Sequence, residues 1–412
     1  MIDLQLLREE PERVLALLQK KEPNFPGHRL LELDKLVRAA HVTIEELRHE
    51  KNQLAAKGAA GLTTELREKS KHLGQEIKAH EQKVEEFERE FKELHVSCPN
   101  IPDPNLPEGN KEANKVVKVW GEKPTFSFVP KNHVELNTKL AWFDFALGAQ
   151  MASSGFVFYK EPGAKLIYSL AMTMLNNNMQ HGFSLALPPY VVSEKSLEGA
   201  GQFPKFKNAV YAIPEDGLYL TPTSEVNLAN VYRDHIFSDV ELPVRMTSWT
   251  SCFRREAGTY GATERGLIRI HQFEKVELYS IVTPEKSEQE QEAMLACAEA
   301  LLQKLGLHYR VSLLAMQDSS FAAAKTYDLE VWMPGQNAYY EVSSISNCTD
   351  FQSRRCAMRY RIDGQGKTHY VHTLNASSLA LPRLMVALME NYQQADGSVA
   401  LPDVLKSVSL TW

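Results

Sequence analysis

Cysteine is scarce in this sequence, and long apolar runs are missing. Among 412 residues there are five cysteines and no CxxC pair: Cys98, Cys252, Cys297, Cys348 and Cys356. The closest two are separated by seven residues, with no histidine at ligand spacing, so we expect neither a disulfide nor zinc. No stretch approaches the roughly 18 apolar residues of a membrane span, so we expect no membrane partner. Because the amino terminus lacks the parts of a signal peptide, we expect a cytoplasmic protein.

Glycine-rich phosphate loops and an excess of positive charge are also missing. Neither GxGxxG nor GxxxxGK[ST] occurs, so any nucleotide chemistry must use another device. A net charge of -6 at pH 7 does not suit a protein that coats nucleic acid by neutralising its phosphates. Any contact with nucleic acid must therefore be local. The length is that of two domains with separate cores.

Apolar residues repeat at alternating steps of three and four over residues 30–54 and again over residues 66–94. This spacing is the heptad seam of a coiled coil, although Lys51 occupies one apolar slot. A small-residue break at residues 58–61 separates the two runs. Because the break is short, the sequence predicts an antiparallel helical hairpin over about residues 28–97.

Charge is distributed unevenly along this predicted hairpin. Residues 48–71 hold six Lys or Arg against three Glu, whereas residues 76–93 hold four against seven. The periodicity alone leaves a dimerisation element or a spacer open. A basic far end, however, suits an arm that reaches a phosphate backbone. We therefore predict RNA contacts at the tip, through Arg48, Lys51 and Lys57.

A proline-rich segment, residues 99–110, follows the hairpin and stiffens the chain. We expect an N-terminal domain over residues 1–110, including this linker, and a second domain over residues 111–412. Short alternating runs in the second domain are interspersed with helical stretches. This pattern predicts an α+β fold with an antiparallel sheet flanked by helices.

The run from Gly266 to Tyr279 reads as one strand with a polar face and an apolar face. Arg269, Phe273 and Glu277 share its polar face, and Arg254 with Glu256 shares a face of the preceding run, before the loop AGTYGATERG. A solvent-exposed strand would show the same alternation. Together, however, guanidinium groups suit phosphate oxygens, an aromatic ring suits a base, and carboxylates suit an amine or hydroxyl.

The segment FRREAGTYGATERGLIRIHQFEKVEL resembles the second signature motif of class II aminoacyl-tRNA synthetases in its seryl form. Around it stand TPTSE, YYEVSSISN and LNASSLALPRLMVALMENYQ, in the order found in seryl-tRNA synthetases, and GAGQFPKF resembles the approach to their active site. The hairpin and linker resemble that family's tRNA-binding arm. The resemblance covers essentially the whole chain and implies the class II catalytic fold.

The resemblance implies an ATP site in which Arg254 contacts the α-phosphate and the substrate carboxylate, and Phe273 stacks under adenine. Arg383 would reach the γ-phosphate or stack over the base, so the implied catalytic residues are Arg254 and Arg383. Glu341 and Ser344 would line the Mg²⁺ and phosphate side, oxygen donors that suit this ion. The full ATP-binding set implied is Arg254, Arg255, Glu256, Arg269, Phe273, Glu341, Val342, Ser343, Ser344 and Arg383.

The implied serine-binding set is Thr223, Ser224, Glu225, Glu277 and Ser377. Taken alone, a serine such as Ser377 is more often a helix cap than a ligand. Many bacterial members carry glycines where this chain has Ala376, Ser378 and Pro382, which puts the fine shape of the serine pocket in question. Pro188 and Pro189 resemble the first class II motif, which builds the family's homodimer, although proline also ends edge strands.

The implied function is that of a serine–tRNA ligase. L-serine and ATP would give seryl-adenylate, and the seryl group would pass to the 3′ end of tRNA(Ser), with tRNA(Sec) a further candidate. One alternative is a synthetase-like amino acid ligase with a different acceptor, but such relatives usually lack the long arm. Another is a catalytically inactive RNA-binding relative, which we would expect to lose Arg254, Glu341 or Arg383, and all three remain.

Overall fold

The computed structural model describes residues 1–58, 63–256, 266–362 and 366–406. The chain forms two compact units, Met1–Pro99 and Asn100–Trp412. Most of the predicted small-residue break at 58–61, and the loop AGTYGATERG up to residue 265, lie outside the described residues. Within the ranges described, no helix is both long and apolar enough to cross a membrane.

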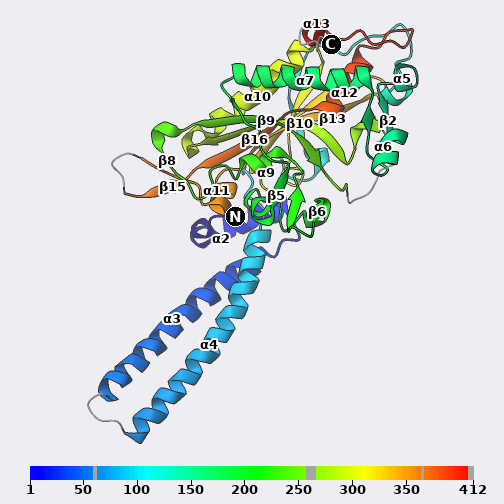
Figure 1. The fold of residues 1–412 in the computed structure, drawn as a ribbon. Coiled ribbons are helices and arrows are strands. Elements are labelled where there is room, and N and C mark those ends of the chain that lie inside the picture. Colours follow the sequence, from blue (N-terminus) through cyan, green and yellow to red (C-terminus); the bar gives the residue numbers. More distant parts are fainter. Residues whose placement is uncertain (59–62, 257–265, 363–365, 407–412) are drawn as a thin grey trace. The chain divides into compact units, whose positions relative to one another are not determined.

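The first unit is helical. It contains α1 (Leu4–Glu9), α2 (Pro11–Lys21), α3 (Gly27–Gly58) and α4 (Thr64–Ser97). The two long helices, α3 and α4, lie side by side along their length, in blue and cyan (Figure 1). The predicted helical hairpin is therefore confirmed.

The heptad seam packs as the spacing predicts. Its buried members are Leu30, Leu33, Ile44, Leu73, Ile77 and Val84. Lys51 and the two polar residues that fill the remaining slots, Ser70 and His80, are half-buried in the seam. Asp34 is buried near the base and pairs with Arg8 at 2.6 Å. Two of the polar slots, Lys51 and Ser70, lie toward the tip, so the seam is less apolar there.

The second unit is built on an eight-stranded sheet with the order β1-β11-β12-β13-β16-β10-β9-β4. Neighbouring strands are antiparallel except for β4, which pairs parallel with β9 at one edge. The predicted antiparallel sheet is confirmed. The strands are β1 (Lys115–Trp120), β4 (Ser184–Leu185), β9 (Val244–Phe253), β10 (Gln272–Val282), β11 (Tyr309–Leu313), β12 (Lys325–Met333), β13 (Ala338–Asn347) and β16 (His372–Ala380).

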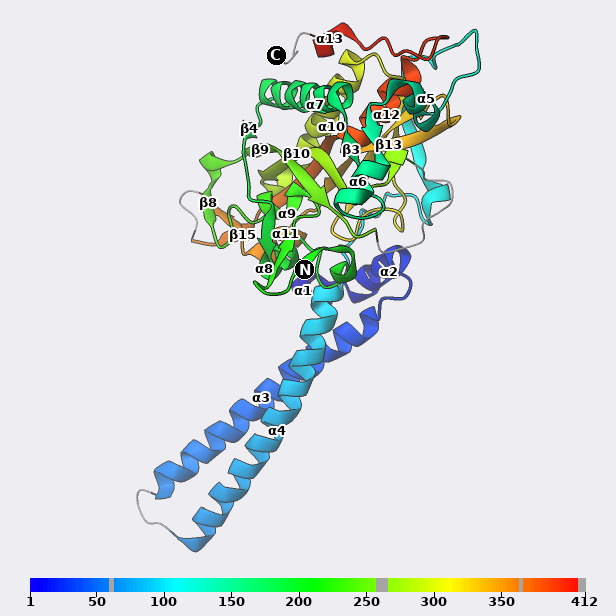
Figure 2. The ribbon, with the colours of Figure 1, turned by 45° about the vertical axis from the view of Figure 1, so that its right-hand side comes forward.

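Three long helices cover one face of this sheet: α7 (Glu161–Gln180), α10 (Ser287–Lys304) and α12 (Leu381–Asn391). They lie on the same side of the strands in both views (Figures 1 and 2). Their apolar residues, including Leu170, Leu301 and Leu384, form one core with Val276 and Leu278 of β10. This core fixes the helix that carries Arg383 against the strand that carries Glu277.

Smaller elements pack against the other face, where Tyr279 and Ile281 of β10 join a second core. The helices among them are α8 (Glu194–Gly199), α9 (Ser224–Leu228) and α11 (Phe351–Cys356). One three-stranded sheet has the order β5 (Val191–Ser193), β7 (Leu218–Leu220), β6 (Ala212–Ile213). The other has the order β15 (Thr368–Tyr370), β14 (Arg359–Arg361), β8 (Ile236–Ser238). The remaining named elements are α5 (His133–Leu140), β2 (Phe143–Asp144), α6 (Phe145–Met151), β3 (Phe158–Tyr159), α13 (Asp403–Lys406) and short 3-10 turns. Both faces of β10 are therefore covered.

The predicted strand from Gly266 to Tyr279 is wrong at its start. Gly266–Ile268 is a 3-10 turn, η4, and Gly266 has φ +69°, a left-handed conformation that interrupts an extended chain. The strand begins only at Gln272. Its predicted polar face is not a solvated surface either, because Lys275 and Glu277 are buried. β9 likewise ends at Phe253, so Arg254 and Glu256 follow that strand and do not belong to it.

Candidate active site

Two adjoining cavities open beside the middle of the sheet. The first, which we call the arginine cavity, has a volume of about 190 Å³. Its lining includes Arg254, Glu256, Leu267, Ile268, Arg269, Phe273, Glu341, Val342 and Arg383. It therefore gathers three guanidinium groups around one aromatic ring.

The second, the carboxylate cavity, is lined by acidic and hydroxyl side chains from several elements. Its lining includes Thr223, Glu225, Lys275, Glu277, Ser344, Asn375 and Ser377. Arg254, Lys275, Glu341 and Ser377 line both cavities. A molecule that occupied both cavities would therefore pass Arg254.

The backbone of Arg254 is fixed just beyond the end of β9. Its N–H donates to the carbonyl of His271 at 2.9 Å, and its carbonyl lies 3.0 Å from Nδ1 of the same histidine. The guanidinium lies 5.2 Å from the centre of the Phe273 ring, and its Nε donates to the carbonyl of Pro222 at 3.3 Å. The charged end of Arg254 is thus placed between a ring that can stack on a base and the carboxylate cavity.

The other charged groups of the arginine cavity are held in pairs. Arg269 pairs with Glu256 at 2.6 Å, and Glu256 has φ +47°, which turns the chain directly after β9. Arg383 donates from Nη1 to the carbonyl of Glu341 at 2.9 Å and from Nε to that of Ile268 at 3.2 Å. Two arginines therefore face the cavity from opposite segments in defined orientations.

A buried chain of polar contacts runs through the carboxylate cavity. Lys275 Nζ donates to Thr223 Oγ1 at 2.8 Å, and this hydroxyl donates to Glu277 Oε2 at 2.9 Å. Lys275 and Glu277 also form a buried ion pair. Glu225 accepts hydrogen bonds from Gln352 at 2.7 Å and from Asn375 at 3.1 Å. Two carboxylates therefore face the cavity, with one lysine beside them.

The environment raises the pKa of Glu225 to about 7. Burial is the main cause and the neighbouring Glu277 carboxylate adds to it, while Lys275, Gln352 and Arg254 oppose the shift. A cationic ligand in the cavity would favour the ionised form of Glu225. The arrangement is thus suited to an ammonium group.

A β-bulge places Ser377 and Arg383. In the pairing of β10 with β16, Lys275 lies opposite Ala380 and Glu277 opposite Ser377, so two residues of β16 face one residue of β10. One of the two is Leu379, which is buried and has φ +76°. The bulge keeps Ser377 at the cavity and starts α12 directly afterwards, with Arg383 in its first turn.

Most of the predicted site residues meet at these cavities, but three do not line either one. Ser224, the first residue of α9, is completely buried. Ser343 is completely buried and donates to the carbonyl of Ser377. Arg255 is exposed, and its backbone N–H donates to Ala209 at 2.9 Å. Neither serine hydroxyl lines a cavity. That of Ser343 supports the backbone of Ser377, whereas that of Ser224 is buried without a hydrogen-bond partner.

Five polar residues that line the carboxylate cavity were not predicted as site residues: Gln202, Lys275, Ser320, Ser346 and Asn375. Lys275 could have been found, because it shares the period-two face of β10 with Phe273 and Glu277. Asn375 likewise lies two positions before Ser377 on β16. Gln352 of α11 does not line the cavity but donates to Glu225, and no pattern in the sequence marks it.

The residues on one side of the cavities fit a divalent cation. Glu341 and Ser344 offer hard oxygen donors, and Asp328 lies opposite Ser344 in the register of β12 and β13. Oδ1 of Asp328 is buried without a hydrogen-bond partner, and burial with the nearby Glu341 raises the Asp328 pKa well above its ordinary value. Over the described ranges, no group of three or more His, Cys, Asp or Glu could hold a metal by itself. A cation here would need oxygen ligands from substrate and water.

Comparison with known proteins matches both units of the chain. Residues 1–102 match the family model of the seryl-tRNA synthetase N-terminal domain, and residues 208–392 match that of the class II tRNA synthetase core domain (G, H, P, S and T). A serine–tRNA ligase of Chlamydia abortus is 46% identical over 98% of this chain and 97% of its own length. That of Chlamydia muridarum is also 46% identical, over 98% and 96%.

Solved structures agree in fold over nearly the whole chain. A seryl-tRNA synthetase of Pyrococcus horikoshii, complexed with ATP, superposes with a TM-score of 0.93 at 34% identity, covering 99% of this chain and 98% of that one. A cytoplasmic serine–tRNA ligase of Naegleria fowleri, in complex with AMP, gives 0.86 at 27% identity, covering 99% and 97%. Sequence, fold and cavity agree: the chain belongs to the seryl-tRNA synthetase family of class II aminoacyl-tRNA synthetases.

Proposed function

We propose that this chain activates L-serine with ATP and transfers the seryl group to the 3′ end of tRNA(Ser). The observation that carries the proposal is the position of Arg254, which lines both the arginine cavity and the carboxylate cavity. ATP would occupy the first, with its base on Phe273, and serine the second. An inactive RNA-binding relative is not favoured, because Arg254, Glu341 and Arg383 together line the arginine cavity.

In the first step, the serine carboxylate attacks the α-phosphorus of ATP and pyrophosphate leaves, which gives seryl-adenylate. Charge builds on the phosphate oxygens, and the Arg254 guanidinium is placed to stabilise it while holding the carboxylate. Arg383 and Arg269 would hold the outer phosphates, with Glu256 orienting Arg269. Glu341 and Ser344 would hold Mg²⁺, which neutralises phosphate charge when bound.

In the second step, a ribose hydroxyl at the 3′ end of tRNA attacks the adenylate carbonyl, and AMP leaves. The protein supplies no nucleophile in either step. Its contribution is to place the two reactants in line and to stabilise charge, which is the main source of rate in phosphoryl and acyl transfer.

Amino acid choice tests the carboxylate cavity. A cavity that hydrogen-bonds a hydroxyl leaves its buried polar groups unpaired when alanine binds instead. We expect serine to be preferred over alanine by about 10⁴-fold in kcat/KM. ATP–pyrophosphate exchange with each amino acid measures this ratio, and equal rates would contradict the assignment.

Arg254→Lys tests the proposed catalytic residue. Lysine keeps the charge but loses the forked geometry that can join phosphate and carboxylate oxygens. We expect adenylate formation to fall by at least about 10²-fold, the scale for one preorganised donor. Arg361→Lys, an exposed arginine on β14, is the matched control and should match the wild-type rate. Wild-type exchange in a folded Arg254→Lys protein would refute the role.

The pKa of Glu225 predicts a pH dependence of serine binding. With a pKa of about 7 in the empty cavity, the carboxyl is mostly protonated at pH 6 and must release its proton to meet the serine ammonium. Serine should therefore bind about tenfold more weakly at pH 6 than well above pH 7. Calorimetry in two buffers of different ionisation enthalpy should detect proton release at pH 6, and Glu225→Gln should abolish that release. Affinity that is constant across this range would contradict the proposed role of Glu225.

The N-terminal domain, residues 1–110 with its linker, is proposed to bind tRNA, and residues 111–412 to form the catalytic domain. Replacing residues 36–88 by a short Gly-Ser turn should leave pyrophosphate exchange largely intact, because every residue proposed to bind ATP or serine follows position 220. Charging of tRNA should collapse. Pyrophosphate exchange, tRNA charging and sedimentation should be measured on the same deleted protein. Loss of both activities together would indicate that the hairpin is a dimerisation element or spacer and not a tRNA-binding arm.

The tip charges provide a milder test of the same arm. Arg48→Glu, Lys51→Glu and Lys57→Glu should weaken tRNA binding and reduce its salt dependence, because fewer counterions are released. The matched control reverses three exposed charges of the stem, Lys78, Lys83 and Arg89. The control should bind tRNA better than the tip variant. Equal loss in both would show a nonspecific effect of net charge.

We also propose a homodimer, with cytoplasmic localisation and with tRNA(Sec) as a second acceptor. The dimer proposal is supported by apolar side chains exposed on α7 and beyond the edge strand β4, such as Tyr168, Met172, Leu185 and Leu187. An exposed apolar area at a sheet edge suits a self-complementary contact. Five free, buried cysteines suit a reducing compartment.

A further inference from the structure

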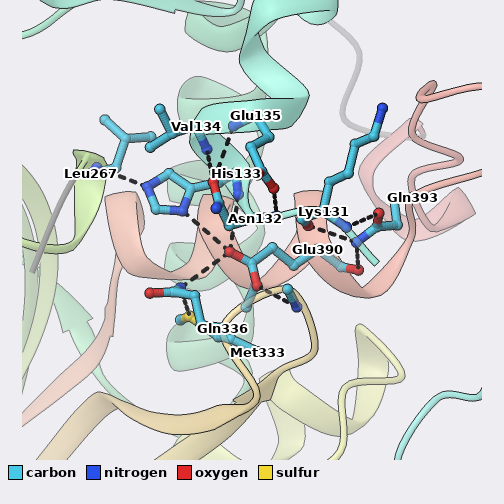
Figure 3. A network of polar contacts seen from close by, with 12 residues as sticks. Lys131, Asn132, His133, Val134, Glu135, Leu267, Met333, Gln336, Glu390 and Gln393 are labelled. Carbon is cyan, nitrogen blue, oxygen red and sulfur yellow. Dashed lines mark hydrogen bonds and ion pairs between the residues drawn. The ribbon is translucent and has the colours of Figure 1, made fainter. Parts of the chain in front are cut away.

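Figure 3 shows a polar network around His133 and Glu390 that extends to Leu267, a residue lining the arginine cavity. At its centre are His133, the first residue of α5, and Glu390, near the end of α12, which are 2% and 0% exposed. The His133 ring lies with Nδ1 3.2 Å from Glu390 Oε1 and with Nε2 3.2 Å from the backbone nitrogen of Leu267. The histidine therefore links two segments that are far apart in the sequence.

The contacts of the ring determine where its proton lies. The Leu267 N–H can only donate, so Nε2 of His133 must accept with its lone pair. A neutral imidazole then carries its single proton on Nδ1 and donates it to Glu390. A second proton, on Nε2, would face the Leu267 N–H, so that two hydrogen-bond donors would meet with no acceptor between them. The network thus requires one tautomer of a neutral histidine.

Glu390 receives donors from three directions. Its Oε1 accepts from the backbone N–H of His133 at 3.0 Å and from Gln336 Nε2 at 3.1 Å, and its Oε2 accepts from the N–H of Gly335 at 3.0 Å. Gly335 and Gln336 form the turn between β12 and β13. One carboxylate therefore joins α5, α12 and the turn that leads into the strand of Glu341.

The network reaches the arginine cavity through Leu267 and its neighbour. Leu267 and Ile268 line this cavity, and the carbonyl of Ile268 accepts from Nε of Arg383 at 3.2 Å. Arg383 and Glu390 lie seven residues apart on α12, two turns along the same side of the helix. The segment of Leu267 is thus attached to α12 twice, by Arg383 directly and by Glu390 through His133.

The fit around His133 is close. A Cβ added to Gly266 would lie 2.2 Å from Nε2 of His133 and 2.8 Å from Cγ2 of Val134. Only glycine leaves the room for the imidazole to approach the Leu267 N–H. The backbone on one side and the carboxylate on the other therefore hold the ring in a single position.

We propose that His133 is a positioning residue of the ATP site: held by Glu390, it fixes the Leu267–Ile268 wall against α12 and thereby the orientation of Arg383. This inference rests on the proposed function and adds to it a residue more than 120 positions before the site in the sequence. It predicts that loss of the Leu267 hydrogen bond weakens ATP binding and leaves serine binding unchanged. The carboxylate cavity shares no hydrogen bond described for this network.

Two substitutions test separately the two contacts of the His133 ring, with Leu267 and with Glu390. Glutamine can place an oxygen near the position of Nε2 and accept from Leu267, whereas asparagine can place an N–H near Nδ1 and donate to Glu390. We expect His133→Asn to raise the KM for ATP in pyrophosphate exchange about tenfold, the scale of one buried hydrogen bond lost. His133→Gln should lie within about threefold of wild type. The KM for serine should be unchanged in both.

Gly266→Ala provides an independent route to the same effect, because its methyl group would displace the ring without removing it. The cost of alanine at a positive φ is controlled by Gly217→Ala, since Gly217 has φ +64° and no atom near the added Cβ. Gly266→Ala should raise the KM for ATP about tenfold, as His133→Asn does. Gly217→Ala should not.

Three outcomes would overturn the inference. ATP KM values equal to wild type in both His133→Asn and Gly266→Ala would show that the contact does not matter for ATP. Equal increases in the KM for ATP in His133→Gln and His133→Asn would show that the hydrogen bond from Leu267 is not the contact that matters. Parallel changes in both KM values, kcat and the melting temperature would indicate a purely structural network. An inactive wild-type enzyme in the same assay would instead refute the proposed function.

Discussion

The pairing of β10 with both of its neighbours is the constraint on which the rest of the catalytic unit depends. Its register with β9 brings Phe273 opposite Cys252, two residues before Arg254. Its register with β16 brings Glu277 opposite Ser377. A slip of one residue would turn Phe273, Lys275 and Glu277 into the core of α7 and α12. The buried side chains Val276 and Leu278 therefore specify the chemistry as firmly as the polar residues do.

Charge is divided between the two cavities in a way that separates the reactants. Three arginines line the cavity where a polyphosphate would lie, beside Glu256 and Glu341. Glu225 and Glu277 line only the cavity where an amino acid would lie, and Lys275 lines both. The positive charge of Lys275 offsets the repulsion between the two buried carboxylates when no ligand is bound, since neighbouring like charges disfavour ionisation. The ligand's ammonium would share that task when it binds.

Much of the fold could be predicted from the sequence for physical reasons, whereas most of the site residues were implied by the resemblance to the family. Heptad spacing over residues 30–94 reflects a seam that must be buried, and period-two alternation placed Phe273 and Glu277 on one face. The same alternation wrongly predicted a strand at residues 266–271. There Ile268 and Ile270 are buried like strand residues, but the N–H groups of Leu267 and His271 bond outside the sheet, to His133 and to Gly155. Pairing of backbone groups is not visible in side-chain periodicity.

The seam of the hairpin becomes less apolar toward its far end. Leu30 and Leu33 are fully buried near the base, whereas Lys51 and Ser70 occupy seam positions near the tip. Burial of apolar area supplies most of the free energy that holds two helices together, so local opening should require least free energy at the tip. The end that would meet RNA can therefore adapt its shape to the ligand, while the base transmits little of that adjustment to the remainder of the helical unit.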